Sequence, residues 1–328
     1  MNLKNIINQI SRHETITRQP PVLIDIGASI EVNPIWEQIA RFSVCLAFDA
    51  DDRDFVYEEK EDSGYKKLIK INKIVVDKTT DHGKKKDFFL TNSPYCSSLL
   101  EPNTESLKDY HYADLFTVTD KKQMEVIELN EALRLAGIEK IDWFKTDSQG
   151  TDLRLLRSLP EDVQNNMIVI DMEPGFINAY KGEDKLAACI SYMESKNNFY
   201  LTRFNVKGPY RISPGYFNDL YKSKLSKKVI RHILNPVPGW AEITYMNSFK
   251  GQKVSSREYL LAWLFSTLQN YHEIAYSYSR SASEQFDDAI FNTLVKYSTD
   301  RVKRRFLSFS TMTKMTRVAI RKFFGGKQ

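Results

Sequence analysis

The chain has 328 residues, of which 42% are hydrophobic and 12% aromatic, a composition typical of a folded globular protein with one large core and room for an appendage. Its three cysteines are widely spaced and odd in number, which excludes a disulfide framework and a cysteine zinc site. Because no apolar stretch is long enough to span a bilayer and no signal-peptide segment is recognisable, the sequence predicts a cytoplasmic protein.

The net charge of +5 is concentrated at the C-terminus. Residues 301–328 contain nine Lys and Arg and no acid, so the rest of the chain carries 38 basic against 42 acidic residues. A mildly acidic body disfavours a nucleic-acid partner. The basic tail has apolar and basic residues on different sides of a helical wheel, which suits peripheral contact with the inner face of an anionic membrane. A helix packed on the acidic body, or a frayed terminus, explains the same pattern.

The first predicted strand, residues 22–26, ends in a turn of small residues at 27–29. It follows an N-terminal stretch, 1–19, that is predicted as an amphipathic cap helix. A second strand, 42–48, is followed by Asp49, about twenty residues after the turn, where a βαβ unit places an acid on a ribose hydroxyl. This spacing favours a nucleoside-containing cofactor, although an ordinary buried strand and turn would have the same pattern.

The turn lacks the spaced glycines that bind pyrophosphate, and this indicates which nucleoside-containing cofactor it suits. A pyrophosphate-binding turn needs three spaced glycines, whereas here one glycine is soon followed by Glu31, whose carboxylate would repel pyrophosphate. S-Adenosylmethionine has no phosphate, and its sulfonium and amino groups tolerate the nearby Asp25. The turn therefore favours S-adenosylmethionine over a nicotinamide dinucleotide.

The rest of the chain first alternates predicted strands and helices and then becomes helical. In chain order we predict a helix at 34–40, a strand at 68–76, a turn at 81–83, a strand at 87–91, a polar loop at 92–103, a helix at 126–135, a strand at 141–147, a helix at 151–159, a strand at 167–172, a helix at 184–195 and a strand at 199–204. This alternation predicts an α/β domain over residues 20–239, with helices on both faces of one sheet.

Residues 240–328 are predicted as a helical appendage. A capping box at Ser255–Glu258 opens a helix that runs through Leu268. A polar break at 276–283 then separates it from a second helix at 283–297. The sequence gives no indication of the oligomeric state.

Three stretches in order resemble the FkbM-type methyltransferases: Val22–Ala28, Cys96–Asn103 and Phe144–Gly150. Ile170–Glu173 is similar to the acidic strand end that follows in that family, and the similarity covers roughly residues 20–205. The resemblance implies a class I, Rossmann-like fold that binds S-adenosylmethionine. It also implies methyl transfer to an oxygen, often a hydroxyl of a sugar or of a natural product.

The resemblance also implies the roles of individual residues. By position, Asp25 and Gly27, with Ala28 in the same turn, contact the methionine part of the cofactor, Asp49 contacts the ribose, Ser97 and Ser98 lie near the cofactor, and Asp147 lies at the floor of the site. Two positions depart from the family, because Ile30 replaces a frequent glycine and Asp49 stands where Glu is usual. Since Ile30 could narrow the methionine pocket, a non-catalytic binding or scaffold protein on a degenerate methyltransferase core is the alternative interpretation.

The candidates for acid–base chemistry are Asp147 and Glu173, which end neighbouring predicted strands where ligands gather. Lys145 could orient one of these acids. His111 is interpreted as a solvated loop histidine rather than a base. The two carboxylates could also hold a divalent cation, but two ligands are too few for us to predict a metal. The acceptor is expected to be a glycan or a small hydroxylated metabolite.

Overall fold

The computed structural model describes residues 2–28, 32–51, 53, 64–77, 85–230 and 234–306. These residues form two compact units. Residues 20–252 form the α/β unit, and residues 2–19 together with 253–306 form the helical unit. Ser29, Ile30 and Glu31, the predicted turn at 81–83 and the basic tail beyond Phe306 lie outside the described residues.

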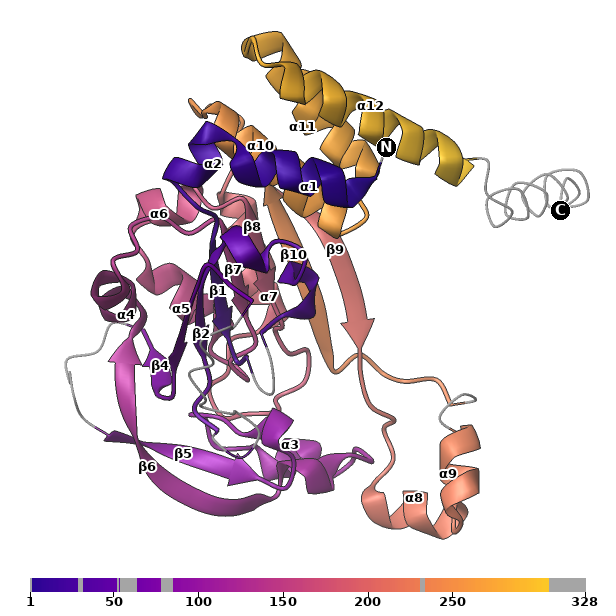
Figure 1. Ribbon diagram of the computed structural model, residues 1–328. Helices are drawn as coiled ribbons and strands as arrows, with labels where there is room; N and C mark the ends of the chain where they lie inside the picture. The colour runs from indigo at the N-terminus through magenta and orange to yellow at the C-terminus, as the bar shows by residue number, and fades with distance from the viewer. Residues whose placement is uncertain are drawn as a thin grey trace, which may run out of the picture. The chain divides into compact units, whose positions relative to one another are not determined.

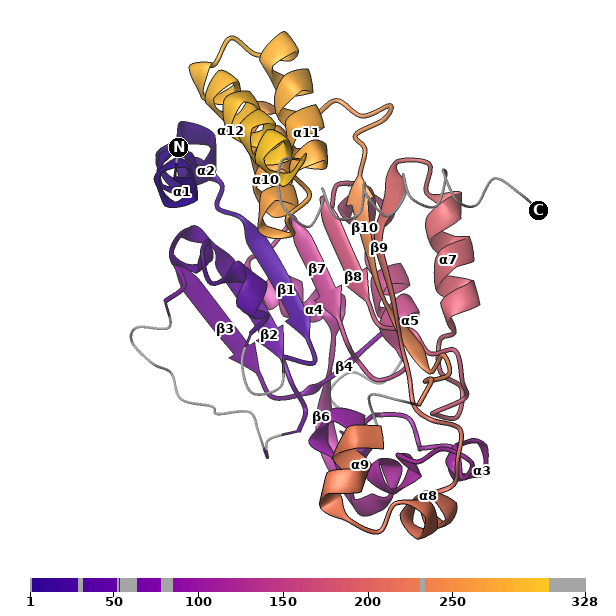
Figure 2. The same ribbon diagram turned by 90° about the vertical axis from the view of Figure 1, so that its right-hand side faces the viewer.

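The α/β unit is built on a seven-stranded sheet (Figures 1 and 2). Its strands are, from one edge to the other, β3 (Lys67–Ile71), β2 (Val44–Phe48), β1 (Val22–Ile26), β7 (Trp143–Thr146), β8 (Val169–Met172), β10 (Trp240–Asn247) and β9 (Phe199–Lys207). Neighbouring strands are parallel except that β10 runs antiparallel to both β8 and β9. The predicted α/β sheet is therefore confirmed, with one antiparallel strand inserted near an edge.

The central strands are mostly apolar because both faces of the sheet are covered, although Asp25 lies in β1 and Lys145 in β7. Leu23, Ile24, Leu46 and Phe144 are fully buried. The principal helices between the strands are α4 (Leu129–Ala136), α5 (Asp152–Ser158), α6 (Glu161–Asn165) and α7 (Leu186–Ser195). Apolar residues of α4, α5 and α7 pack in the same core cluster as the strands.

A second, three-stranded sheet has the order β4 (Ile74–Val76), β6 (Val118–Glu128), β5 (Lys85–Thr91). The remaining elements of the α/β unit are short: η1 (Pro34–Trp36), η2 (Ala40–Phe42), η3 (Pro94–Cys96), α3 (Thr104–Leu107), η4 (Ala113–Phe116), α8 (Pro214–Leu220) and α9 (Lys224–Ile230). The helix predicted at 34–40 is thus replaced by two 3-10 turns.

Two predicted elements of this region were wrong because non-local pairing overrides the local pattern. The strand predicted at 68–76 is split, since its first half extends the main sheet and its second half pairs with β6. The helix predicted at 126–135 starts only at Leu129, because the preceding residues 126–128 pair with β4.

The helical unit consists of α1 (Leu3–Arg12), α2 (Glu14–Arg18), α10 (Ser256–Leu268), α11 (His272–Gln285) and α12 (Ala289–Phe306). The predicted capping box is confirmed, with Ser255 as N-cap and Glu258 bonding back to its backbone. The polar break predicted at 276–283 is wrong. It lies inside α11, whose buried Ala275, Tyr278, Ser279 and Ala282 repeat at helical spacing.

The unit boundaries also differ from the predicted ones. Residues 240–247 form β10 of the sheet, so the C-terminal helices begin only at Ser256. The N-terminal helices belong with those C-terminal helices rather than forming a separate element, and His13 Nε2 lies 2.8 Å from Asp288 Oδ2. Within the described ranges, no helix combines the length and hydropathy that crossing a membrane requires.

Candidate active site

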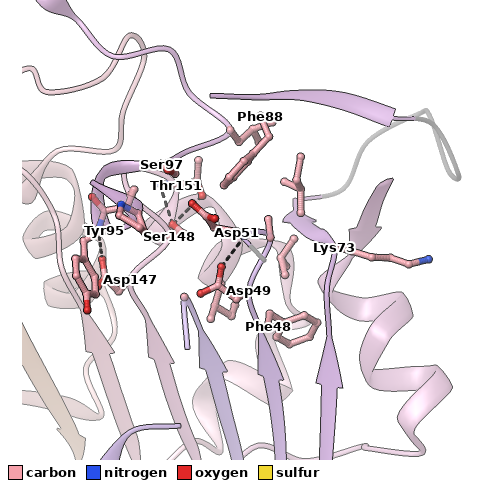
Figure 3. Close-up of a pocket in the computed structure, with 18 residues that line it drawn as sticks. Phe48, Asp49, Asp51, Lys73, Phe88, Tyr95, Ser97, Asp147, Ser148 and Thr151 are labelled. Atoms are coloured by element: carbon pink, nitrogen blue, oxygen red, sulfur yellow. Dashed lines mark hydrogen bonds between the residues drawn. The ribbon is translucent and has the colours of Figure 1, made fainter. Parts of the chain in front are cut away.

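Four of the parallel strands end at the same edge of the sheet, and a predicted site residue follows each of them. Gly27 comes after β1, Asp49 after β2, Asp147 after β7 and Glu173 after β8. Gly27, Asp49 and Asp147 line one crevice at this edge, together with Ser97 (Figure 3). This is the edge at which parallel α/β sheets bind ligands.

The turn after β1 requires glycine. Gly27 has φ +78°, and a Cβ atom there would lie 2.2 Å from the carbonyl oxygen of Asp147. The amides of Gly27 and Ala28 both donate to the carbonyl oxygen of Phe48, at 2.9 and 3.0 Å, and the amide of Asp147 donates to Ile26 at 2.9 Å. The backbone at the ends of β1, β2 and β7 is therefore held together at one point.

We expect Gly27→Ala to destabilise the α/β unit by about 2 kcal/mol or more, since the new methyl group meets backbone that cannot move aside. Chemical denaturation measures this loss. Gly182→Ala is the matched control, because Gly182 has a similar φ of +72° and nothing within 4 Å of its Cβ position. Equal losses in the two variants would show that the left-handed conformation alone, and not the close approach of Asp147, determines the cost.

The crevice wall formed after β2 is acidic. Asp49 Oδ1 accepts a hydrogen bond from the Asp51 amide at 2.8 Å, and both side chains line the crevice. Asp51 is buried, which would raise its pKa, but hydrogen bonds from Arg53 and Ser97 lower the pKa overall and keep the carboxylate charged. Arg53 Nη2 lies 2.5 Å from Asp51 Oδ2 and donates to Ser97 Oγ at 2.8 Å.

Part of the crevice lining is apolar and includes Ile74, Val75 and Phe88. The cation of the lining, Lys73, extends away from Asp49 and Asp51 (Figure 3) and pairs with Glu125 at 2.9 Å. The described lining of the crevice therefore combines carboxylates with apolar side chains.

Asp25 and Lys145 form a buried ion pair behind the turn. Lys145 Nζ lies 2.9 Å from Asp25 Oδ1 and 3.3 Å from the carbonyl oxygen of Gly27, and the Asn33 amide donates to Asp25 Oδ2 at 2.8 Å. Burial lowers the pKa of Lys145, but the Asp25 and Asp147 carboxylates outweigh it and raise the pKa overall. Neither side chain lines the crevice. The acid that Lys145 orients is therefore Asp25, and the pair supports the turn.

The two predicted serines have different positions. Ser97 lines the crevice, and its Oγ accepts from the Thr91 amide at 3.2 Å. Ser98 is buried outside the lining, where its hydroxyl donates to the Gln149 carbonyl at 2.8 Å. Ala28 is likewise buried outside the lining.

A larger cavity adjoins the crevice and has a volume of about 500 Å³, and we call it the acceptor chamber after the role that we propose for it below. Its lining combines three carboxylates with several rings: Tyr95, His111, Tyr112, Phe116, Asp147, Glu173, Tyr180, Glu183 and Trp240. Tyr95, Asp147 and Gln149 line both the crevice and the chamber, so Asp147 lies where the two cavities meet.

The Asp147 carboxylate is oriented by two residues that sequence reasoning did not assign. Gln149 Nε2 donates to Asp147 Oδ1 at 2.5 Å, although Gln149 has a strained φ of +56°. The Tyr180 hydroxyl lies 2.9 Å from both Gln149 Oε1 and the Cys96 carbonyl oxygen, and donates its proton to one of them. Gln149 lies in the Phe144–Gly150 stretch that resembles the family, whereas nothing in the local sequence distinguishes Tyr180.

Asp152 was also missed, and it joins the ends of β7 and β8. Its Oδ1 accepts from the Ser148 amide at 2.9 Å and from Thr146 Oγ1 at 3.1 Å, and its Oδ2 accepts from the Glu173 amide at 2.8 Å. Because these bonds fix both strand ends, Asp152 positions Asp147 and Glu173 relative to each other.

The Asp147 and Glu173 carboxyl groups influence each other's pKa. Burial raises the pKa of Asp147 to about 6 despite the nearby Lys145. Burial and the Asp147 charge together raise the pKa of Glu173 more strongly. Among the described residues no hydrogen-bond donor contacts the Glu173 carboxyl group. At neutral pH the geometry therefore favours a proton on Glu173 and a charge on Asp147.

His111 is not the solvated loop histidine that the sequence suggested. Its ring lines the acceptor chamber, and its Nδ1 accepts from the Tyr210 amide at 3.1 Å. Non-local contact between the loop at 208–213 and the η4 region produces this position, which no local pattern indicates.

A seven-stranded sheet in this order, with a ligand crevice at the carboxyl ends of β1, β2 and β7, defines a Rossmann-like methyltransferase fold, here followed by C-terminal helices. Residues 25–200 match the model of the methyltransferase FkbM domain, and the chain belongs to that family. In the same comparisons no curated protein and no solved structure matched the chain.

Proposed function

We propose that this methyltransferase uses S-adenosylmethionine and methylates a hydroxyl oxygen of a glycan or another hydroxylated metabolite. The supporting observation is that the crevice and the acceptor chamber meet at Asp147, a buried carboxylate. A cofactor in one cavity and an acceptor in the other would then face each other across a proton acceptor.

The described crevice suits this cofactor chemically. Asp49 would contact the ribose hydroxyls, and the apolar side chains of Ile74, Val75 and Phe88 suit the adenine ring. The acidic lining suits a cofactor that is positively charged and carries no phosphate. S-Adenosylmethionine would supply an electrophilic methyl group on its sulfonium. The described residues enclose a volume of only about 90 Å³, so we expect the crevice to widen when the cofactor binds.

The residues around the junction have separable tasks in this proposal. Asp147 accepts the proton of the acceptor hydroxyl, while Gln149 holds the carboxylate in one orientation. Glu173 keeps its own proton and so leaves the negative charge on Asp147. Most of the rate enhancement then comes from aligning the acceptor oxygen with the methyl group, and the base adds about 10²–10⁴-fold.

The lining of the acceptor chamber supports a sugar-like acceptor. The rings of Tyr112, Phe116 and Tyr180 contribute apolar surface, and carboxylates such as Glu183 could accept hydrogen bonds from hydroxyl groups of the acceptor. A sugar ring presents both kinds of surface. Turnover with labelled cofactor and a panel of surface-glycan precursors tests the acceptor class directly.

We expect Asp49→Ala to weaken S-adenosylhomocysteine binding about 10- to 100-fold, because hydrogen bonds to a carboxylate contribute about 1.5–3 kcal/mol. Calorimetry with the purified chain measures the affinity. Asp120→Ala removes an exposed carboxylate of β6 and should bind as tightly as the wild type. Absence of binding by the wild-type chain would instead support the non-catalytic interpretation, and equal affinity of the wild type and Asp49→Ala would remove Asp49 from the cofactor site.

A further inference from the structure

The segment formed by α8 and α9, residues 214–230, carries an unusual concentration of exposed apolar side chains, and we call it the α8–α9 lobe. Tyr216, Leu220, Leu225 and Val229 are 71%, 65%, 72% and 50% exposed. Within the described ranges, the other large hydrophobic side chains exposed by half or more are Tyr95 and Leu135. Four such residues in one short segment indicate an interaction surface rather than scattered surface residues.

The spacing places these side chains on the outer faces of the two helices. Tyr216 and Leu220 are four residues apart on α8, as are Leu225 and Val229 on α9, so each pair shares one helix face. Phe217, next to them on α8, is buried instead, and its ring centroid lies 5.5 Å from that of His111. The packing of Phe217 anchors the lobe and leaves the apolar pairs outside.

The charge of the lobe is strongly positive. Its sequence contains four lysines, at 222, 224, 227 and 228, and one acid, Asp219. Lys222 and Lys224 are exposed, and neither forms an ion pair with a described residue. Apolar side chains beside unpaired lysines match a surface that is apolar inside and anionic at its boundary, as a bilayer with acidic headgroups is.

We infer that the α8–α9 lobe docks on an anionic lipid surface. The chain that leads into the lobe includes Gly208 and Pro209, which line the acceptor chamber. In both views α8 and α9 lie at the same end of the α/β unit as α3, beyond the carboxyl ends of the strands (Figures 1 and 2). Docking would therefore bring the chamber close to the lipid headgroups. The inference goes beyond methyl transfer and does not depend on it.

Vesicle sedimentation of the full-length chain tests the inference. We expect tighter binding to phosphatidylcholine vesicles containing a quarter phosphatidylglycerol than to phosphatidylcholine alone. The variant Leu220→Ser/Leu225→Ser should bind the anionic vesicles about tenfold more weakly, since both side chains leave the apolar interface. Leu135→Ser is the matched control, because Leu135 is 67% exposed on α4 and should not affect binding.

A charge variant separates the two contributions. Lys222→Ser/Lys224→Ser should weaken binding to the anionic vesicles and leave the weak binding to neutral vesicles unchanged, and Lys122→Ser on β6 is its control. The basic tail is present in every variant, so the differences report the lobe alone. Wild-type binding by the double leucine variant would overturn the inference. So would light scattering that finds a wild-type dimer converted to a monomer by that variant, because a second copy would then cover the surface.

Discussion

Asp147→Asn is expected to reduce turnover about 10²–10⁴-fold while S-adenosylhomocysteine affinity stays within about threefold of the wild type. Asparagine keeps the size of the side chain and its contact with Gln149, but it cannot accept a proton at neutral pH. Asp147 lines both the crevice and the acceptor chamber, and in the proposed function it accepts the proton of a hydroxyl bound in that chamber. Turnover with labelled cofactor and calorimetry on the same protein preparations measure the two effects.

The pH dependence gives a second measurement of the same residue. Because the pKa of Asp147 is raised to about 6, kcat/KM of the wild type should rise with pH through about 6 and then level off. Asp120→Asn should leave both turnover and this profile unchanged, since Asp120 is exposed on β6. Near-normal turnover of Asp147→Asn would assign Asp147 a structural role at the end of β7.

Glu173→Gln is expected to stabilise the protein, and more so as the pH rises. The folded-state pKa of Glu173 is raised above its unfolded value by burial and by the Asp147 charge. Its carboxyl group therefore contributes stability that is fully present below the unfolded pKa and is lost as the pH rises toward the folded pKa. Because glutamine does not ionise, the free energy of unfolding of the variant should lack this loss at higher pH.

Chemical denaturation at pH 4 and pH 8.5 compares the two proteins. We expect nearly equal free energies of unfolding at the lower pH and an advantage of about 2 kcal/mol or more for Glu173→Gln at the higher pH. Glu139→Gln, at an exposed position, is the control and should follow the wild type at both values. If the variant and the wild type lose stability in parallel, Glu173 ionises in the folded protein as freely as in the unfolded chain.

The position of Glu173 in the site explains why it lowers the free energy of unfolding. A carboxyl group held beside Asp147 without a hydrogen-bond donor destabilises the empty protein, and such groups concentrate where ligands bind. We therefore expect Glu173→Gln to combine higher stability with altered acceptor turnover, whereas a purely structural residue would change stability alone.

Features with local signals could be predicted from the amino-acid sequence alone. The apolar runs at Val22–Ile26 and Val44–Phe48 form strands because both faces of a parallel sheet are covered. Gly27 is specified by the turn that only glycine fits, and Ser255 with Glu258 specifies a helix start through bonds within four residues. Asp49 and Asp147 could be placed at the same sheet edge because residues that directly follow parallel strands meet there.

The remaining features depend on contacts between residues that are far apart in the sequence, and only the tertiary structure shows them. Residues 126–128 are a strand because they pair with β4. Residues 240–247 are a strand because they pair with β8 on one side and with β9 on the other. Only the folded chain brings Tyr180 to Gln149, Asp25 to Lys145 and His111 into the chamber wall. A hydrogen bond or ion pair across more than thirty residues leaves no periodic trace in the sequence around either partner. The positions of the strand ends were therefore predictable, and the orientation of the side chains between them was not.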